Sequence, residues 1–529
     1  VIEQVQADLI HLHRQRQTTV GGLAESWTVS DDGRRYRLTL RRDVHFSDGE
    51  PFDADDVVFT FGAILDPEVG SPQIDTLRFD GEPITAEKID RHTVDIVLPI
   101  PYAGGEDLFD GVFVLPEHRL GEAWREGTLA SAWSAGTAVD EIVGLGPFRL
   151  AEVVPGERIV LERNPHYWRR DAEGGALPYL DRLIFNVVAD DDAQTLRFQA
   201  GESHLIEGLS SDLYARLAQA AESADVPFTI ADLGPGLVYE FLFWNLNDLP
   251  ASLDPERAET LRRRQGWFRQ IAFRRAVSLA IDRGAIASLV YRGRATPVGG
   301  HITPANRRWH DTRVVAPAPA PQESRHLLTE AGFTWDAEGR LIDPDGVQVT
   351  FTIVTNASNP RRVQTATVVQ DDLARIGIEI QTVPLDFGGL LDRVYDTFDY
   401  DVGLLGLGRG GTDPNSALNV WLSTGDSHLW HFGDGPTTEW EARLDELLQR
   451  QMVELDADIR REQVAEIQRL VADQLPYVFL VAPNVLVGAH RDLGNFAPAV
   501  LDPSTLWNSE HLFWRDAERR GSTTGSGPS

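Results

Sequence analysis

The chain has 529 residues, of which 42% are hydrophobic and 25% are charged, and its 81 acidic and 49 basic residues give a formal net charge of −32. That length predicts more than one hydrophobic core, and so acidic a surface argues against nucleic acid as a partner. The absence of cysteine excludes a catalytic thiol, a thiolate zinc site and a disulfide framework. No apolar run approaches the roughly 18 residues that a membrane-spanning helix needs.

The first part of the chain predicts strands joined by tight turns. Residues 36–40 alternate apolar and polar side chains, as a half-buried strand does, and the run Asp31-Asp32-Gly33 before them favours a hairpin turn. Asp53 predicts the N-cap of a helix, because its carboxylate can accept a backbone N–H at the positive end of the helix dipole.

The rest of the chain mixes strands and helices. Strands are predicted at 183–188, 240–246, 349–354, 378–383 and 477–487. Helices are predicted at 193–200, 268–291, 362–376 and 439–474, and Gly377 ends the third of them. This mixture predicts an α/β or α+β protein of several domains.

Six groups of segments, in a fixed order, resemble one protein family. They are Gly22–Trp27 with Ser30–Gly33, Arg41–Phe52 and Ala54–Phe59; Gly144–Phe148 with Pro155–Glu157 and Leu161–Trp168; Phe273–Arg283; Ala331-Gly332 with Gln370–Ile378; Asp399–Val402 with Thr412–Pro414; and Leu475–Phe479. Together they span roughly residues 20–510. The chain resembles the oligopeptide- and nickel-type solute-binding proteins of ABC importers, family 5.

The resemblance implies an α/β fold of the periplasmic-binding-protein type II, with two lobes and an extra domain inserted in the first. Lobe I would comprise residues 1–20, 145–264 and 483–520, the inserted domain 21–144 and lobe II 265–482, with 521–529 as a flexible tail. Crossing strands near 245–265 and 481–484 would form the hinge. Family members carry a further strand before the equivalent of Gly22, so the opening strand of lobe I is expected to be missing.

The implied function is that of a receptor without enzymatic activity or a cofactor. It would close as a monomer around a small solute, outside the cytoplasmic membrane, and deliver that solute to an ABC permease and its ATPase. A lipid anchor N-terminal to Val1 stays open. Peptide is the commonest solute of the family, oligosaccharide is the alternative, and a glycoside-acting enzyme with two carboxylates is a third hypothesis. The sequence contains no Gly-x-Ser-x-Gly, His-Glu-x-x-His or phosphate-loop motif.

One departure from the family weakens the peptide hypothesis. In peptide-binding members, an aspartate three residues before an Asp-Pro dipeptide holds the ammonium group of the peptide. Here the dipeptide is Asp413-Pro414 and the matching position is Gly410. A buried ammonium without a carboxylate is costly, and Arg409 beside that position would repel one.

The same region is rich in aromatic rings, which could stack on sugar rings. Trp421 and Trp430 lie close together in the sequence, and by resemblance residues 239–244 form a strand that faces the cleft. Core packing is the alternative for each ring. The predicted ligand-binding residues are Tyr239, Phe241, Trp244, Arg409, Thr412, Asp413, Asn419, Trp421 and Trp430.

Histidines and arginines give weaker signals. His428 and His431 could share a helical face as metal ligands, but no third ligand stands at a clear spacing, so no metal site is predicted. His11 and His13 predict an exposed surface pair. The basic run at 262–264, with Arg274 nearby, is expected to pair with surface acids or to meet the permease.

Overall fold

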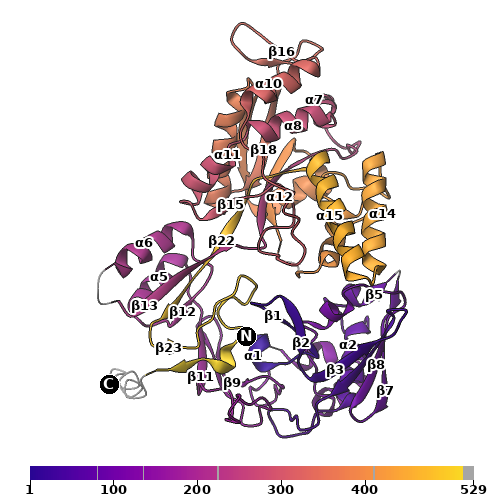
Figure 1. The fold of residues 1–529 in the computed structure, drawn as a ribbon, viewed down its shortest axis with the longest axis vertical. Helices are drawn as coiled ribbons and strands as arrows, with labels where there is room; N and C mark the ends of the chain where they lie inside the picture. Colours follow the sequence, from indigo (N-terminus) through magenta and orange to yellow (C-terminus); the bar gives the residue numbers. More distant parts are fainter. Residues whose placement is uncertain (80, 135, 223–225, 409–410, 516–529) are drawn as a thin grey trace. The chain divides into compact units, whose positions relative to one another are not determined.

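The computed structural model describes residues 1–515 except 80, 135, 223–225 and 409–410, and it divides into two compact units (Figure 1). Unit 1 comprises Val1–Ala231, Val453–Leu455 and the described residues from Val487 onward. Unit 2 comprises Asp232–Met452 and Asp456–Leu486. The described helices lack the combination of length and apolar character that a bilayer span requires.

Unit 1 begins with α1 (Ile2–Val5), a hairpin and a four-stranded antiparallel sheet in the order β3-β4-β8-β7. The bounds are Ile10–His13 (β1), Thr18–Gly21 (β2), Ala24–Val29 (β3), Arg35–Leu40 (β4), Thr85–Asp90 (β7) and Thr93–Val97 (β8). Exposed and buried residues alternate along β4, which confirms the predicted strand. Asp53 caps α2 (Ala54–Leu65) as predicted, in a capping box with Asp56.

The rest of unit 1 contains a three-stranded antiparallel sheet, β11-β10-β9, and several helices. The bounds are Phe148–Val154 (β9), Arg158–Arg163 (β10), Arg182–Asn186 (β11), Glu117–Arg125 (α3), Leu129–Ala132 (α4), Asp191–Gln199 (α5) and Ser211–Ala221 (α6). The strand predicted at 183–188 and the helix predicted at 193–200 are confirmed with small shifts of their bounds.

Unit 2 is built on a five-stranded mixed sheet in the order β19-β18-β20-β14-β21. The bounds are Tyr239–Trp244 (β14), Thr350–Asn356 (β18), Glu379–Leu385 (β19), Val402–Leu407 (β20) and Tyr477–Phe479 (β21). β18 pairs in parallel with β19 and β20, whereas β14 pairs antiparallel with β20 and β21. Every residue of β14 is buried, as the predicted internal strand requires.

Helices cover both faces of this sheet (Figure 1). Their bounds are Pro255–Phe268 (α7), Ile271–Ala280 (α8), Pro321–Glu330 (α10), Pro360–Ala374 (α11), Glu439–Val453 (α14) and Ala457–Gln474 (α15). Leu242 and Trp244 pack with α7, α8 and α11 on one face, while Phe241 and Phe243 pack with α14 and α15 on the other. The alternation of a strand explains this division.

Two predicted helices are interrupted in the structure. The helix expected at 268–291 ends at Ala280, because Asp282 leaves the helical path: its backbone N–H donates to Asp372, and its carboxylate caps the short helix that starts at Arg283. The helix expected at 439–474 is divided into α14 and α15, and Asp456 caps the second. The helix before Gly377 is confirmed, and that glycine adopts a positive φ of 88°.

The boundary between the units differs from the predicted lobe boundary. The chain leaves unit 1 within β13 (Phe228–Pro235), between Ala231 and Asp232, and returns within β22 (Val481–His490), between Leu486 and Val487. Residues 232–264, which were expected in lobe I, therefore belong to unit 2. The reason is physical: β14 is hydrogen-bonded on both sides within the sheet of unit 2, so it cannot belong to another unit.

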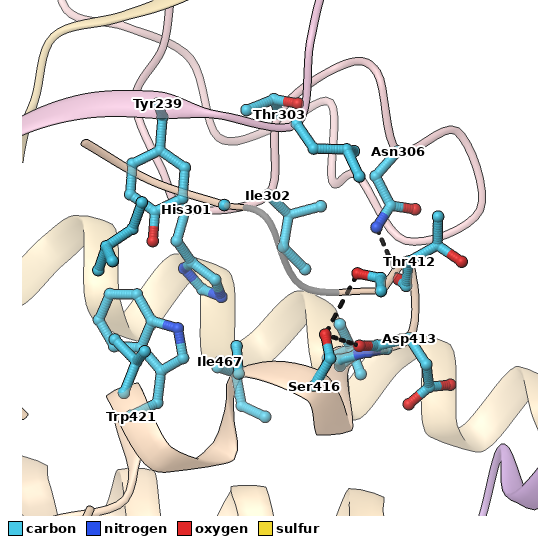
Figure 2. A pocket seen from close by; sticks show the side chains of 18 of the residues that line it. Tyr239, His301, Ile302, Thr303, Asn306, Thr412, Asp413, Ser416, Trp421 and Ile467 are labelled. Carbon is cyan, nitrogen blue, oxygen red and sulfur yellow. Dashed lines mark hydrogen bonds between the residues drawn. The ribbon is translucent and has the colours of Figure 1, made fainter. Parts of the chain in front are cut away.

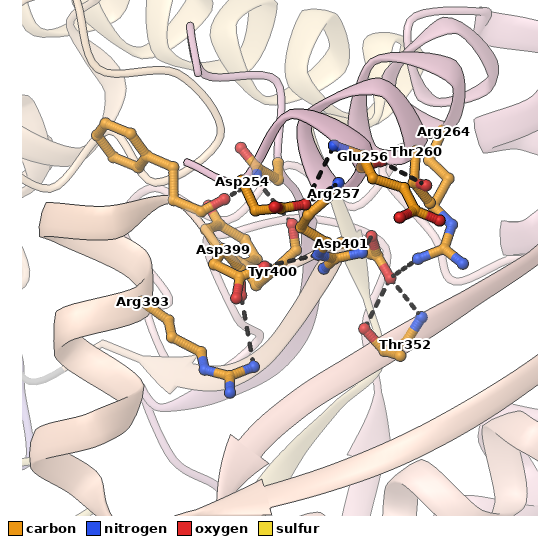
Figure 3. Close-up of polar contacts among 12 residues, drawn as sticks. Asp254, Glu256, Arg257, Thr260, Arg264, Thr352, Arg393, Asp399, Tyr400 and Asp401 are labelled. Carbon is orange, nitrogen blue, oxygen red and sulfur yellow. Dashed lines mark hydrogen bonds and ion pairs between the residues drawn. The ribbon is translucent and has the colours of Figure 1, made fainter. Parts of the chain in front are cut away.

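A buried carboxylate joins α7 to the sheet of unit 2 (Figure 3). Asp401, whose side chain is fully buried, accepts hydrogen bonds from the guanidinium of Arg264 at 2.6 Å and from the backbone and hydroxyl of Thr352 at 2.8 and 2.7 Å. Arg257 of the same helix donates to Asp399 at 2.6 Å. Arg264, the last residue of the basic run at 262–264, thus pairs with a buried acid inside unit 2. It has a structural role and does not pair with a surface acid or meet the permease.

Replacing Asp401 with alanine should lower the free energy of unfolding of unit 2 by about 3 kcal/mol, because a buried charge and two donors lose their partner. Calorimetry on the full chain can resolve the transition of this unit. The control is Asp458→Ala, which removes a 90% exposed carboxylate paired with Arg461 and should change little. Equal effects of the two changes would contradict the assigned role of Asp401.

Candidate functional site

Unit 2 contains a cavity of about 280 Å³ near the ends of β14 and β20 (Figure 2). Its wall comes from four places: the start of β14, the loop at 301–306, the segment that follows β20, and the helices α14 and α15. All of the lining residues that the structure describes belong to unit 2. Segments distant in the sequence therefore meet at one site.

An ion pair fixes the segment that follows β20. The carboxylate of Asp413 accepts two hydrogen bonds from the guanidinium of Arg460 on α15, at 2.6 and 2.7 Å, and both side chains are buried. Asp413 also caps the short helix at 414–417 by accepting the N–H of Asn415. Gln451 of α14 accepts further hydrogen bonds from Arg460, and the guanidinium lies 4.7 Å from the ring centroid of Trp309.

One wall of the cavity is aromatic. Trp421, on α13 (Leu418–Trp421), is 2% exposed, and its ring centroid lies 4.4 Å from that of His301. Tyr239 completes this wall, and Figure 2 shows the three rings gathered at one end of the cavity. The other end is polar, with Thr412, Asp413 and Ser416.

The described lining carries no uncompensated charge. Burial lowers the pKa of His301 to about 3, so its ring is neutral at physiological pH. Burial also raises the pKa of Tyr239 well above its usual range, which keeps the phenol protonated. Asp413 is the one carboxylate among these lining residues, and Arg460 neutralises it.

Comparison with known proteins identifies the family. Residues 18–428, well over half of the chain, match the profile of the bacterial extracellular solute-binding proteins, family 5, middle region. The chain belongs to this family. It is thus the substrate-binding component of an ABC transporter, as the resemblance of its motifs predicts.

Individual relatives agree with this assignment. The chain is 29% identical over 483 residues to a probable ABC transporter-binding protein of Deinococcus radiodurans, covering 88% of this chain and 79% of the relative. It is 26% identical over 473 residues to the oligopeptide-binding protein AppA of Bacillus subtilis, covering 87% and 78%.

Solved structures show the same fold. The substrate-binding protein CtaP of Listeria monocytogenes matches with a TM-score of 0.78 and 23% identity, covering 97% of this chain and 94% of the other. The AppA structure of Bacillus subtilis, determined with a nonapeptide, matches with a TM-score of 0.70 and 24% identity over 97% and 94%.

Five of the nine predicted ligand-binding residues line the cavity of this solute-binding protein. They are Tyr239, Thr412, Asp413, Asn419 and Trp421. Arg409, like Gly410, lies outside the described residues. Although Asp413 lines the cavity, both of its oxygens are bound to Arg460, so it offers a ligand no free carboxylate.

The other three predicted residues pack in the core of unit 2, away from the cavity. Trp244 lies on the face of β14 opposite to that of Tyr239, and it donates its Nε1–H to the carbonyl of Leu475. Phe241 stacks on Tyr477 with centroids 4.3 Å apart. Trp430 donates its Nε1–H to the carboxylate of Glu441. The core-packing alternative holds for these rings because the sheet is covered on both faces.

Sequence reasoning missed the loop at 301–306. His301, Thr303 and Asn306 line the cavity, and the side chain of Asn306 donates to the carbonyl of Thr412 at 2.7 Å. The only signal in the sequence was the pair Gly299-Gly300 before this loop. In the structure, a Cβ on Gly299 would lie 2.3 Å from the carbonyl oxygen of Val315, so a side chain does not fit there. A glycine pair is equally typical of an ordinary turn.

The histidine predictions have different outcomes. His428 is buried against the ring of Trp430 and is not grouped with His431 in any cluster of three possible metal ligands among the described residues. One such cluster exists, Asp8, His11 and Asp110 in unit 1. There His11 is partly buried rather than exposed, and Arg14 already donates to Asp110 at 2.8 Å. The cluster is thus an ion-paired network.

Replacing Arg460 with methionine should lower the free energy of unfolding by about 3 to 5 kcal/mol, because the carboxylate of Asp413 then stays buried without a partner. The double variant Arg460→Met, Asp413→Asn removes both charges and should recover much of this loss. Calorimetry of the two variants measures the difference. A double variant that is no more stable than the single one would show that the charge of Asp413 is unimportant.

The network of His11 predicts a pH dependence of stability. Burial opposes protonation of His11, but its hydrogen bonds to Asp110 and Asp8 outweigh burial and raise its pKa to about 9 from 6.5. Because the folded-state pKa is the higher one, this stabilisation is fully present below pH 6.5 and is lost as the pH rises through 9. The loss amounts to at most about 3 kcal/mol.

The variant His11→Gln should therefore lose most of the decline in melting temperature that the unchanged protein shows between pH 6.5 and 9. His326→Gln is the matched control, since His326 is 62% exposed and meets only Glu330 across one helical turn. Parallel pH profiles for His11→Gln and the unchanged protein would refute the assignment.

Proposed function

We propose that this protein captures an oligopeptide-type solute in the cavity of unit 2 and delivers it to a membrane permease and ATPase. The observation that carries the proposal is the cavity itself. Its aromatic wall of Tyr239 and Trp421 faces a polar end where the one described carboxylate, that of Asp413, is neutralised by Arg460. Such a lining suits a peptide main chain and its side chains, whose amides are polar and neutral.

The relatives favour peptide as the solute. Curated relatives include the oligopeptide-binding protein AppA, a di/tripeptide-binding protein and a dipeptide-binding protein. The oligosaccharide alternative rested on a cluster of five aromatic side chains, and three of these, Phe241, Trp244 and Trp430, pack in the core instead. We propose further that the protein acts as an extracytoplasmic monomer, and a lipid anchor stays a prediction.

We propose no catalysis. A glycosidase needs two available carboxylates at the substrate. The described lining of the cavity offers one carboxylate, that of Asp413, and Arg460 occupies both of its oxygens. Neither an acid nor a nucleophile is therefore available from that residue.

Thermal unfolding of the full chain with short peptides and β-linked oligosaccharides tests the proposal. A ligand at 100 times its Kd should add about 2.7 kcal/mol to the free energy of unfolding and raise the melting temperature. Stabilisation by peptides is the expected result. Stabilisation by oligosaccharides alone would replace the proposal with its alternative.

Trp421→Ala should weaken binding of the stabilising peptide at least tenfold, because the ring supplies much of the apolar wall of the cavity. Isothermal titration below the melting temperature of the variant measures the affinity. The control Phe387→Ala removes a ring of unit 2 that is 53% exposed and absent from the lining, and it should bind normally. Unchanged affinity of Trp421→Ala would place the ligand elsewhere.

A further inference from the structure

The cavity of unit 2 offers a ligand mainly apolar surface. Five of the residues that line it are apolar and only partly buried, so a group inside the cavity can contact them: Leu237, Ile302, Leu407, Pro414 and Ala417. The lining also contains two exposed polar residues, Ser416 and Asn419, and both are uncharged. A ligand group therefore meets apolar atoms together with a few neutral dipoles.

The apolar lining continues into the core of unit 2. Leu448 of α14 and Ile467 of α15 line the cavity and belong to the same hydrophobic cluster as Tyr239 and Trp421. Figure 2 shows Ile302 between the aromatic rings and the polar end of the cavity. A dry apolar cavity of about 150 Å³ accommodates benzene in another protein. The cavity here, at about 280 Å³, is therefore large enough for a long or aromatic side chain.

The described lining offers no partner to a cation. Its one carboxylate, that of Asp413, accepts two hydrogen bonds from Arg460 and one from the backbone N–H of Asn415. Positions 409 and 410, outside the described residues, are an arginine and a glycine, which have no carboxylate. Burial of an ammonium without a partner is costly. The cavity thus disfavours both a lysine side chain and the amino terminus of a peptide.

We infer that this cavity is a subsite for one large apolar side chain of the bound peptide, such as that of methionine, leucine or phenylalanine. The inference rests on the proposed capture of peptides. Moving such a side chain from water onto apolar surface is favourable in proportion to the area that it buries. A polar side chain of the same length loses its water without equivalent partners, and lysine also buries a charge. Ile302, in the middle of the cavity, sets this preference.

Isothermal titration of the full chain with tetrapeptides tests the preference. In an alanine background, each position in turn carries methionine, glutamine or lysine, whose side chains have similar length but differ in polarity and charge. We expect the methionine peptide with the tightest binding to exceed the glutamine and lysine peptides substituted at the same position at least tenfold.

The variant Ile302→Glu places a carboxylate inside the cavity. It should bind the lysine peptide at least tenfold more tightly than the unchanged protein does, and it should lose the preference for methionine. The matched control is Ile459→Glu, which adds the same charge to unit 2 at a residue that is 51% exposed and absent from the lining. This control should keep the preference for methionine.

A second variant tests the same surface without a new charge. Ile302→Ala removes apolar atoms from the cavity, so it should weaken binding of the methionine peptide severalfold and leave the glutamine peptide nearly unchanged. Melting temperatures of the three variants establish that they are folded before their affinities are compared.

The outcomes separate the inference from the proposed function. If peptides bind but glutamine or lysine matches methionine, or if Ile302→Glu and Ile302→Ala both keep the preference, the apolar subsite is overturned and peptide capture stands. If none of the peptides binds, both are overturned.

Discussion

The ion pair between Asp413 and Arg460 determines what the cavity of unit 2 can hold. Two charges leave water together, and this is tolerable only because the geometry is bidentate and Gln451 accepts the remaining hydrogen bonds of the guanidinium. The pair ties the segment after β20 to α15, so the polar end of the cavity has a fixed wall. It also occupies both oxygens of the only carboxylate in the described lining. One interaction thus both shapes the site and leaves the lining that the structure describes without an unpaired charge.

The central position of β14 explains how the sheet and the site are related. Leu242 and Trp244 face one set of helices, and Phe241 and Phe243 face the other. Only the first residue of the strand, Tyr239, reaches the cavity, because the strand starts at its edge. The aromatic residues of β14 therefore have two roles. The residue at the start of the strand lines the cavity, and those further along pack in the core.

Much of the fold was predictable from the sequence, because its signals are local. The alternation along β4, the capping residue Asp53 and the glycine at 377 act within a few residues, and each produced the expected element. The break after Ala280 was not predictable, because it depends on Asp372, which lies 90 residues away. The lobe boundary likewise depends on which strands pair with β14.

The site was predictable in part, for the same reason. The Asp-Pro motif and the following tryptophan led to Asp413 and Trp421, which do line the cavity. The sequence could not separate Trp421 from Trp430, since the choice between them is made by helix α14, where Glu441 binds the second ring. His301 and Asn306 could not be found, because tertiary packing alone brings their loop to the segment after β20.

The way the chain crosses between its units has a consequence for biosynthesis. Unit 2 is almost continuous in sequence, whereas unit 1 needs both the first residues and those that follow Leu486. β12 (Leu205–Ile206) pairs with Gly488 and Ala489, so this part of unit 1 lacks its partner strand until the chain has been made through residue 489. The unit whose translation begins first is therefore completed after unit 2, and a chain truncated before Val487 loses part of the sheet of unit 1.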